Sequence, residues 1–278
     1  MVYDIRTRSG AVMPNLGSGT WRMGENEATR RDEVRALQLG LDLGVRLIDT
    51  AEMYADGGAE HVVGDAMEGR RDEVFLVSKV LPQNASYAGT RTACDRSLKR
   101  LRTSWIDLFL LHWPGEHPVE ETLRAFVTLA EQGKIRHFGW SNFDLDELTR
   151  AEEWPGGPRI AADQVLYNLE RRGVERRLIP WCASRKIAIM AYSPLEQGRL
   201  RPNDALRRVA LRHDATPAQV ALAFTLRHDN VVAIPKATKP AHVRDNAKAA
   251  DIVLTEEDLA DIDRAFPPPR RDTPLDTL

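Results

Sequence analysis

The amino-acid sequence predicts an α/β fold, a (β/α)8 TIM barrel with an N-terminal hairpin and extra helices. Short apolar runs alternate with amphipathic stretches along all 278 residues, which is typical of a parallel sheet covered by helices. The ends of the apolar runs recur about every 30 residues, which fits eight βα units in a closed barrel better than two halves of an open sheet. No Pro/Gly/Ser-rich linker interrupts the pattern, so residues 1–278 are expected to form a single domain.

The expected strands are apolar runs rich in β-branched and aliphatic residues. In order they cover residues 16–20, 45–49, 74–79, 106–112, 135–141, 161–165, 187–193 and 231–236. Before them, Ser9-Gly10 separates two short extended pieces, which predicts a hairpin that closes the bottom of the barrel.

Helices are expected between the strands, and three have clear end signals. The stretch from Val119 places apolar residues on one face and stops at Gly133. A second begins with Thr216 as N-cap and Pro217 at the first helical position, and a third begins with Thr255 as N-cap. The longest step between strands holds two helical patterns, residues 204–213 and 217–228, so an extra helix is expected there.

Composition narrows the possible functions. Hydrophobic residues make up 42% of the chain, charged residues 29%, and the net charge is −2. This balance indicates a globular protein and gives no reason to expect nucleic acid or an anionic membrane as a partner. No apolar run is long enough for a membrane span or a signal peptide, so a cytoplasmic location is expected. Cys94 and Cys182 are expected to be reduced, structural thiols.

Polar residues stand where nearly every expected strand ends. They are Asp49, Lys79, His112, Ser141, Asn142, Gln164, Tyr192, Ser193 and Lys236. Because the active site of an α/β barrel lies at the carboxyl ends of its strands, these side chains are expected to face one pocket. Tyr54, on the loop after the second strand, can lean into the same pocket. His112, Glu116 and His117 form only a weak metal-binding pattern, and no metal is expected.

Four of these residues suggest proton chemistry at a carbonyl. Free tyrosine has a pKa of roughly 10, and a lysine ammonium beside Tyr54 would favour the phenolate and ease proton exchange. Asp49 would hold Lys79 in place, and His112 would orient a carbonyl oxygen. Taken singly, each residue also has a plain structural explanation: Asp49 and Lys79 as a buried ion pair, and His112 as a core histidine.

Several motifs, in order and over nearly the whole chain, resemble those of the aldo-keto reductases. They are "GSGTW", "LIDTAEMYADGGAEHVVGDAM", "VSKV", "LHWP", "GWSNF", "QVLYN", "AYSPL" and "IPKA", with Asn246 near the end. The resemblance implies a barrel that binds NADPH, with NADH as a possible substitute, and reduces aldehydes or ketones. It also implies a monomer that acts on a small carbonyl substrate.

The resemblance assigns roles residue by residue. It implies a catalytic tetrad of Asp49, Tyr54, Lys79 and His112, with Tyr54 as proton donor. Cofactor contacts are implied for Gly19, Thr20, Trp21, Asp49, Ser141, Asn142, Gln164, Tyr192, Ser193, Leu195, Lys236, Thr238, His242 and Asn246. Among these, the resemblance implies that Ser141, Asn142 and Gln164 bind the nicotinamide carboxamide and that Tyr192 stacks under the ring. It implies that the phosphates are held by Ser193, Leu195, Lys236 and Thr238, and the adenine by Asn246. Substrate contacts are implied for Trp21, Tyr54, His112 and Trp113.

Two departures from the family pattern stand out. The connection after the fourth strand, "LHWPGEHPVEETL", and the tail "PPPRRDTPLDTL" are short, so the parts that cover the substrate in larger members are expected to be reduced. In "IPKATKPAHVRDN", Ala237 replaces the usual serine, and His242 stands where an arginine usually reads the 2′-phosphate, with Arg244 two residues on. A weaker preference for NADPH over NADH is therefore expected.

Two other functions stay open at this point. A Schiff-base aldolase would use Lys79 as its nucleophile, and a regulatory subunit would bind the cofactor with little turnover. Gly17-Ser18-Gly19 looks like the start of a dinucleotide-binding loop, but Arg22 occupies the place of the third glycine.

Overall fold

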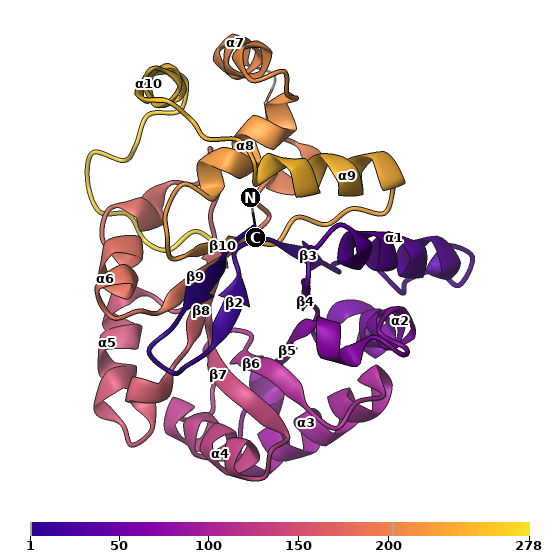
Figure 1. Ribbon diagram of the computed structural model, residues 1–278. Helices are drawn as coiled ribbons and strands as arrows, with labels where there is room; N and C mark the ends of the chain where they lie inside the picture. Colours follow the sequence, from indigo (N-terminus) through magenta and orange to yellow (C-terminus); the bar gives the residue numbers. More distant parts are fainter. Residues whose placement is uncertain (1, 202) are drawn as a thin grey trace.

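The computed structural model describes residues 2–201 and 203–278, and it confirms the predicted barrel (Figure 1). Eight strands form one sheet in chain order, and every neighbouring pair is parallel. The strands are β3 (Gly17–Gly19), β4 (Leu47–Asp49), β5 (Phe75–Val80), β6 (Ile106–Leu111), β7 (Ile135–Ser141), β8 (Ala162–Leu166), β9 (Ala188–Tyr192) and β10 (Val231–Ala233). Each lies within two or three residues of its expected bounds.

A seam between β3 and β10 joins the two ends of the sheet. Leu16 and Ala233 form a parallel bridge, and the Ala233 amide donates to the Asn15 carbonyl at 2.9 Å. The Gly19 amide donates to the carbonyl of Pro235 at 3.1 Å. A Cβ atom at Gly19 would lie 2.7 Å from the carbonyl oxygen of Ile234, so this close approach requires glycine.

Helices surround the strands, as Figure 1 shows. They are α1 (Arg30–Asp42), α2 (Gly58–Ala66), α3 (Tyr87–Leu101), α4 (Val119–Glu131), α5 (Leu145–Glu153), α6 (Leu178–Ser184), α7 (Asp204–Arg212), α8 (Pro217–Thr225), α9 (Pro240–Ala249) and α10 (Glu256–Ala265). Short 3-10 turns are η1 (Tyr54–Gly57), η2 (Arg71–Glu73), η3 (Pro82–Asn84), η4 (Gly157–Arg159), η5 (Gly173–Glu175) and η6 (Glu196–Gly198). The predicted extra helix is present, since α7 and α8 both lie between β9 and β10.

The predicted helix ends are confirmed by their capping bonds. The side chains of Thr216 and Thr255 each accept a hydrogen bond from the backbone amide of the third residue of their helix. The side chain of that third residue accepts one from the backbone amide of the threonine, so both form capping boxes. Helix α4 ends just before Gly133, whose φ of 71° few other residues tolerate.

The N-terminal hairpin closes the bottom of the barrel, as predicted. Its strands β1 (Asp4–Arg6) and β2 (Val12–Pro14) are antiparallel. Ile5 and Met13 pack into the same buried cluster as the inward-facing side chains of the barrel strands. These inward side chains include Leu47, Val77, Leu108, Leu110, Ala162, Ala188, Met190, Val232 and Ile234. Because side chains alternate along a strand, Asp49 and Lys79, two residues beyond Leu47 and Val77, also point into the barrel.

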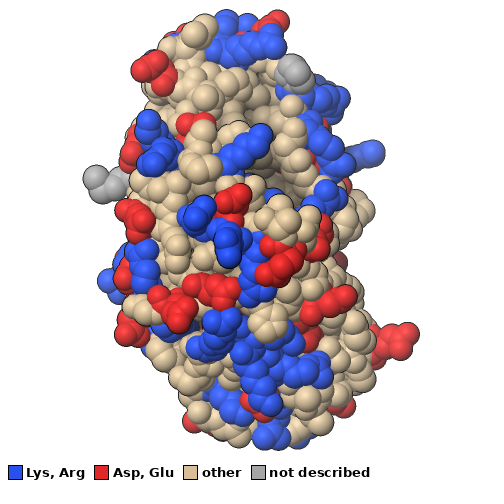
Figure 2. Space-filling model, turned by 90° about the vertical axis from the view of Figure 1, so that its right-hand side faces the viewer, with Lys and Arg blue, Asp and Glu red and all other residues tan. Residues whose placement is uncertain are grey.

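The outer surface carries charges of both signs. Figure 2 shows acidic and basic side chains interspersed over the face that carries α1 to α3, with a group of basic ones toward its lower end. Several are paired there, for example Arg30 with Asp65 at 2.6 Å and Arg70 with Glu73 at 2.8 Å. Within the described residues, no helix is both long and apolar enough to cross a membrane.

Candidate active site

Lys79 is the centre of a buried polar cluster at the carboxyl end of the barrel. Its side chain is 0% exposed, and its ammonium donates to Asp49 Oδ1 at 2.7 Å, to the carbonyl of Thr50 at 2.8 Å and to the hydroxyl of Tyr54 at 3.3 Å. These bonds use all three ammonium protons. The structure therefore brings together three of the four residues that sequence reasoning grouped by chemistry.

The fourth residue, His112, lies against the tyrosine. The ring centroids of Tyr54 and His112 are 5.7 Å apart in an edge-to-face arrangement. Trp21 contacts Tyr54 from another direction at 5.0 Å, and Trp113 contacts His112 at 4.8 Å. The two tryptophans are 41% and 37% exposed, which is unusual for residues so large. They give the tetrad an open aromatic rim on which an apolar group can rest.

Local backbone geometry explains how Tyr54 reaches the cluster. After Tyr54 the chain turns through Ala55 and Asp56, both with φ of 51°. A Cβ atom at Gly58 would lie 2.7 Å from the carbonyl oxygen of Gly24, so the start of α2 and the loop after β3 touch through backbone only. The glycine pair at positions 57 and 58 thus fixes a tight loop that carries Tyr54 inward.

Burial decides the protonation state of the tyrosine. Desolvation raises the pKa of Tyr54 above the ordinary value for tyrosine, the Lys79 ammonium opposes this rise, and the Asp49 charge reinforces it. The expectation that Lys79 favours the phenolate is correct for that one interaction, but it is outweighed. Tyr54 is therefore a neutral phenol near neutral pH, which suits a proton donor.

The ammonium and the imidazole are shifted in opposite directions. For Lys79, burial favours the neutral amine and lowers the pKa. The electrostatic attraction of Asp49, together with the interaction and hydrogen bond with the Tyr54 oxygen, outweighs this effect and raises the pKa above the ordinary value. Burial, reinforced by the nearby Lys79 charge, places the pKa of His112 well below the ordinary range. Lys79 is thus charged and His112 neutral.

The lowered pKa of His112 predicts a pH dependence of stability. The unfolded chain takes up a proton near the ordinary histidine pKa of about 6.5, whereas the folded protein does not. The free energy of unfolding should therefore fall as the pH drops below that value. We expect His112→Gln to lose less stability than the wild type between pH 7 and pH 5, as measured by urea unfolding. His61→Gln, at an exposed position, is the control, and equal pH dependence in all three proteins would contradict the prediction.

The ends of the next strands extend the polar cluster. Gln164 Nε2 donates to the second carboxylate oxygen of Asp49 at 2.7 Å, which joins it directly to the tetrad. The Ser141 hydroxyl donates to the Gln164 carbonyl at 2.9 Å. Asn142, with φ of 59°, donates through Nδ2 to the carbonyl of His112 at 3.0 Å and accepts from the Tyr192 hydroxyl at 3.0 Å. Four predicted cofactor residues thus lie in one connected network.

Two other predicted cofactor residues, Gly19 and Thr20, form contacts that stabilise the barrel itself. Gly19 lies in the seam, and the buried Thr20 hydroxyl donates to the main-chain carbonyl of Asp49 at 2.9 Å. Gly19 has no side chain to offer a ligand, and the hydroxyl proton of Thr20 is already used in this bond.

The start of α9 is a site that favours an anion. The helix begins at Pro240, as expected, and its first turn has neither a side-chain cap nor an acidic residue. Four cationic or titratable side chains flank this end: Lys236, Lys239, His242 and Arg244. All four are exposed, and none forms an ion pair within residues 2–201 and 203–278. Free amides and the helix dipole attract phosphate at such an end. Thr238 and Asn246 are half-buried nearby in the chain.

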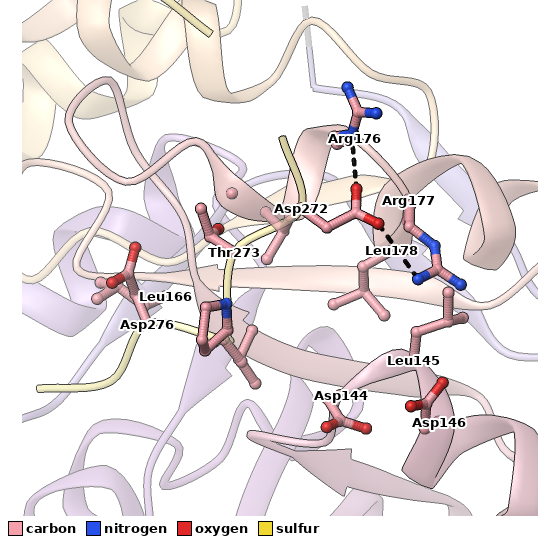
Figure 3. Close-up of a pocket in the computed structure, with 14 residues that line it drawn as sticks. Asp144, Leu145, Asp146, Leu166, Arg176, Arg177, Leu178, Asp272, Thr273 and Asp276 are labelled. Carbon is pink, nitrogen blue, oxygen red and sulfur yellow. Dashed lines mark hydrogen bonds and ion pairs between the residues drawn. The ribbon is translucent and has the colours of Figure 1, made fainter. Parts of the chain in front are cut away.

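A separate cavity of about 180 Å³ lies between the start of α5, the loop before α6 and the C-terminal tail, residues 272–276 (Figure 3). Asp272 anchors the tail there by accepting from Arg176 at 2.5 Å and from Arg177 at 3.4 Å. None of the tetrad residues lines this cavity, so it is distinct from the candidate active site. In the part of the chain described here, no group of three His, Cys, Asp or Glu side chains is placed to hold a metal ion.

Comparison with known proteins decides the family. A family model described as "Aldo/keto reductase family" matches residues 15–266. The chain belongs to the aldo/keto reductase family. One relative, the methylglyoxal reductase YeaE of Escherichia coli, is 49% identical over 276 residues, which cover 97% of each protein. The glyoxal reductase of Bacillus subtilis is 35% identical and covers 93% of this chain and 91% of its own length.

Solved structures agree with this family. An aldo/keto reductase from Klebsiella pneumoniae, in complex with NADP and acetate, is 47% identical, has a TM-score of 0.96 and covers 100% of both chains. The same comparison holds for a Klebsiella pneumoniae aldo-keto reductase in complex with NADPH.

Sequence reasoning missed several contacts within this aldo/keto reductase. The bond from Gln164 to Asp49 was not foreseen, nor was the use of Asn168 as a link between two loops, which is described below. Asn168 is the last residue of the motif "QVLYN". Its position directly after the β8 residues was the sole signal, and that signal does not reveal a partner on another strand.

Proposed function

We propose that this chain uses NADPH to reduce the carbonyl group of small aldehydes, including dicarbonyls such as methylglyoxal, and that Tyr54 donates the proton. The observation that carries the proposal is the buried contact of Lys79 with both Asp49 and Tyr54, with a neutral histidine beside the phenol. The 49% identity to a methylglyoxal reductase supports the substrate class.

The residues at the strand ends fit the proposed cofactor. The network of Asn142, Gln164 and Tyr192 offers amide and hydroxyl groups that match a carboxamide, and the uncapped start of α9 with Lys236 matches a phosphate. NADPH, when bound, supplies the hydride. Structures of two similar proteins contain NADP or NADPH, which supports the same choice here.

Each tetrad residue then has a task at the carbonyl oxygen. Tyr54 gives its proton to this oxygen as negative charge develops on it, and Lys79 stabilises the tyrosinate that remains. Asp49 keeps Lys79 charged and in position. His112 is neutral, so it can donate a hydrogen bond to the carbonyl oxygen and orient it without adding a second positive charge beside Lys79. The exposed rings of Trp21 and Trp113 shelter the substrate from water.

No observation favours the aldolase alternative. A Schiff base requires a neutral amine as nucleophile, whereas Lys79 has a raised pKa and donates to three oxygens.

The direct test is a steady-state assay of NADPH oxidation with methylglyoxal, glyoxal, simple aldehydes and ketones. Turnover with dicarbonyls and small aldehydes is expected. Tight binding of NADPH with negligible turnover of every carbonyl would instead favour a regulatory, cofactor-binding subunit.

The choice of cofactor gives a further prediction at position 242. Histidine carries less positive charge than arginine near neutral pH, so its bond to a 2′-phosphate is weaker. We expect NADPH to be preferred over NADH chiefly through Lys236, and His242→Arg to strengthen that preference about tenfold, the effect of one additional charge-assisted hydrogen bond.

The measurement is the Kd of NADPH and of NADH in the wild type and in His242→Arg. Arg244→Ala is the matched control, because positions 242 and 244 lie about 200° apart around a helix of 3.6 residues per turn. A preference that does not change with His242→Arg would exclude position 242 from phosphate recognition.

A further inference from the structure

The segment that follows β9 is held in an uncommon backbone conformation. Ser193, Glu196 and Gln197 have φ values of 47°, 48° and 55°, and none of them is glycine. Such left-handed residues are strained, and they persist only where the surroundings fix them. This segment, residues 193–197, includes Ser193 and Leu195, two of the residues for which the resemblance to aldo-keto reductases implies contacts with the cofactor phosphates.

Asn168 fixes this segment from the neighbouring strand. It follows β8, is 0% exposed, and donates through Nδ2 to the carbonyl of Ser193 at 2.9 Å and to Glu196 Oε2 at 2.8 Å. Its Oδ1 accepts from the amides of Glu170 at 2.8 Å and Arg171 at 3.1 Å. Both amide protons and the carbonyl oxygen are therefore used, and the side chain links the turn after β8 to the segment after β9.

Glu196 is the second anchor. Its side chain is buried, and besides Asn168 it has Arg171 as a partner at 3.5 Å. Arg171 in turn lies 4.0 Å from Asp276 in the tail. The guanidinium offsets the carboxylate, which otherwise would repel a phosphate brought to this segment. Leu195, the residue before Glu196, packs against two apolar clusters. The segment is therefore held by apolar contacts as well as by hydrogen bonds.

We infer that Asn168 and Glu196 are positioning residues that hold residues 193–197 in the conformation that receives the cofactor phosphates. The inference rests on the proposed function, since it takes this segment to be part of the cofactor site. A segment fixed in advance does not have to be ordered on binding, so a loss of its anchors should weaken cofactor binding rather than the chemical step.

The first test measures the Kd of NADPH by quenching of tryptophan fluorescence, together with kcat at saturating NADPH. For Asn168→Ala and Glu196→Ala we expect Kd to rise about tenfold or more, as expected when a preorganised site must be ordered on binding. Turnover at saturating NADPH should stay within about twofold, because the tetrad is untouched. Glu196→Gln, which can still accept from Asn168, is the matched control and should restore most of the affinity. Wild-type Kd in both alanine variants would overturn the inference.

The second test needs no cofactor and separates this inference from the proposed function. The exposed Arg199 lies two residues after the end of the segment, so trypsin cleavage after Arg199 reports how firmly residues 193–197 are held. Cleavage should be faster in both alanine variants than in the wild type and in Glu196→Gln, at an unchanged midpoint of thermal unfolding. If the wild type fails to bind NADPH, the proposed function is wrong, and equal cleavage rates in all four proteins would still refute the role of the two anchors. Should one alanine variant not fold, the other provides the same comparison.

Discussion

Tyr54→Phe is expected to lose most of its turnover while it keeps its cofactor affinity. The substitution removes one hydroxyl group, which accepts from Lys79 at 3.3 Å and is the only phenol in contact with that ammonium among the described residues. General acid catalysis is typically worth roughly 10²–10⁴-fold, so kcat for methylglyoxal should fall by a factor in this range. The ring stays, so its contacts with Trp21 and His112 are retained.

The measurement is kcat, KM and the Kd of NADPH in both proteins. An interaction made only in the transition state lowers kcat and kcat/KM by the same factor. Tyr87→Phe is a suitable control, since that hydroxyl lies in α3 and contacts Thr128 at 3.3 Å, away from the tetrad. A near-normal kcat in Tyr54→Phe would show that another group supplies the proton.

Lys79→Met is expected to abolish turnover and to destabilise the fold as well. The change leaves the carboxylate of Asp49, 2% exposed, without the cation that faces it. Removal of one partner of a buried ion pair typically costs about 3–5 kcal/mol. Gln164 still donates to the Asp49 carboxylate, so the variant should fold but unfold at a clearly lower urea concentration.

The double variant Asp49→Asn with Lys79→Met separates the two effects. It removes both charges, so most of the lost stability should return, whereas turnover should not, because the tyrosinate still lacks its cation. Urea unfolding and the NADPH oxidation assay on the two single variants and the double variant give the comparison. Equal stability of Lys79→Met and the wild type would mean that the pair does not contribute as the buried geometry indicates.

The fold and the grouping of the site were predictable because they follow from local patterns. Residues two apart on a strand share a face, so Asp49 lies on the same inner face as Leu47, and Lys79 on the same inner face as Val77. Parallel strands bring their carboxyl ends to one rim of the barrel. Thr216 and Thr255 marked their helices by capping chemistry alone. The extent of the single domain, the monomeric state and the cytoplasmic location stay predictions, as do the roles of the individual cofactor residues.

Other features could not be predicted because they depend on contacts between distant segments. The direction of the pKa shift of Tyr54 is set by burial, which outweighs the opposing Lys79 charge, and the degree of burial cannot be read from the identity of the neighbouring residues. The bond of Gln164 to Asp49 and that of Asn168 to Glu196 join different strand ends, and each depends on a rotamer that packing selects. Short-range periodicity predicts which side chains face the rim of the barrel, but not which of them form hydrogen bonds with one another.

The seam between β3 and β10 also sets when the barrel can close as the chain is made. Asn15 and Leu16 are synthesised long before their partner Ala233, which lies far along the chain from them. Until then the growing sheet has two open edges, whose unpaired amides and carbonyls can pair with another chain. The last strand is followed at once by Lys236 and α9, so closure of the barrel and completion of the proposed phosphate site are one event. The open edges of a nascent chain therefore stay exposed to aggregation until Ala233 has been translated and has paired with the first strand.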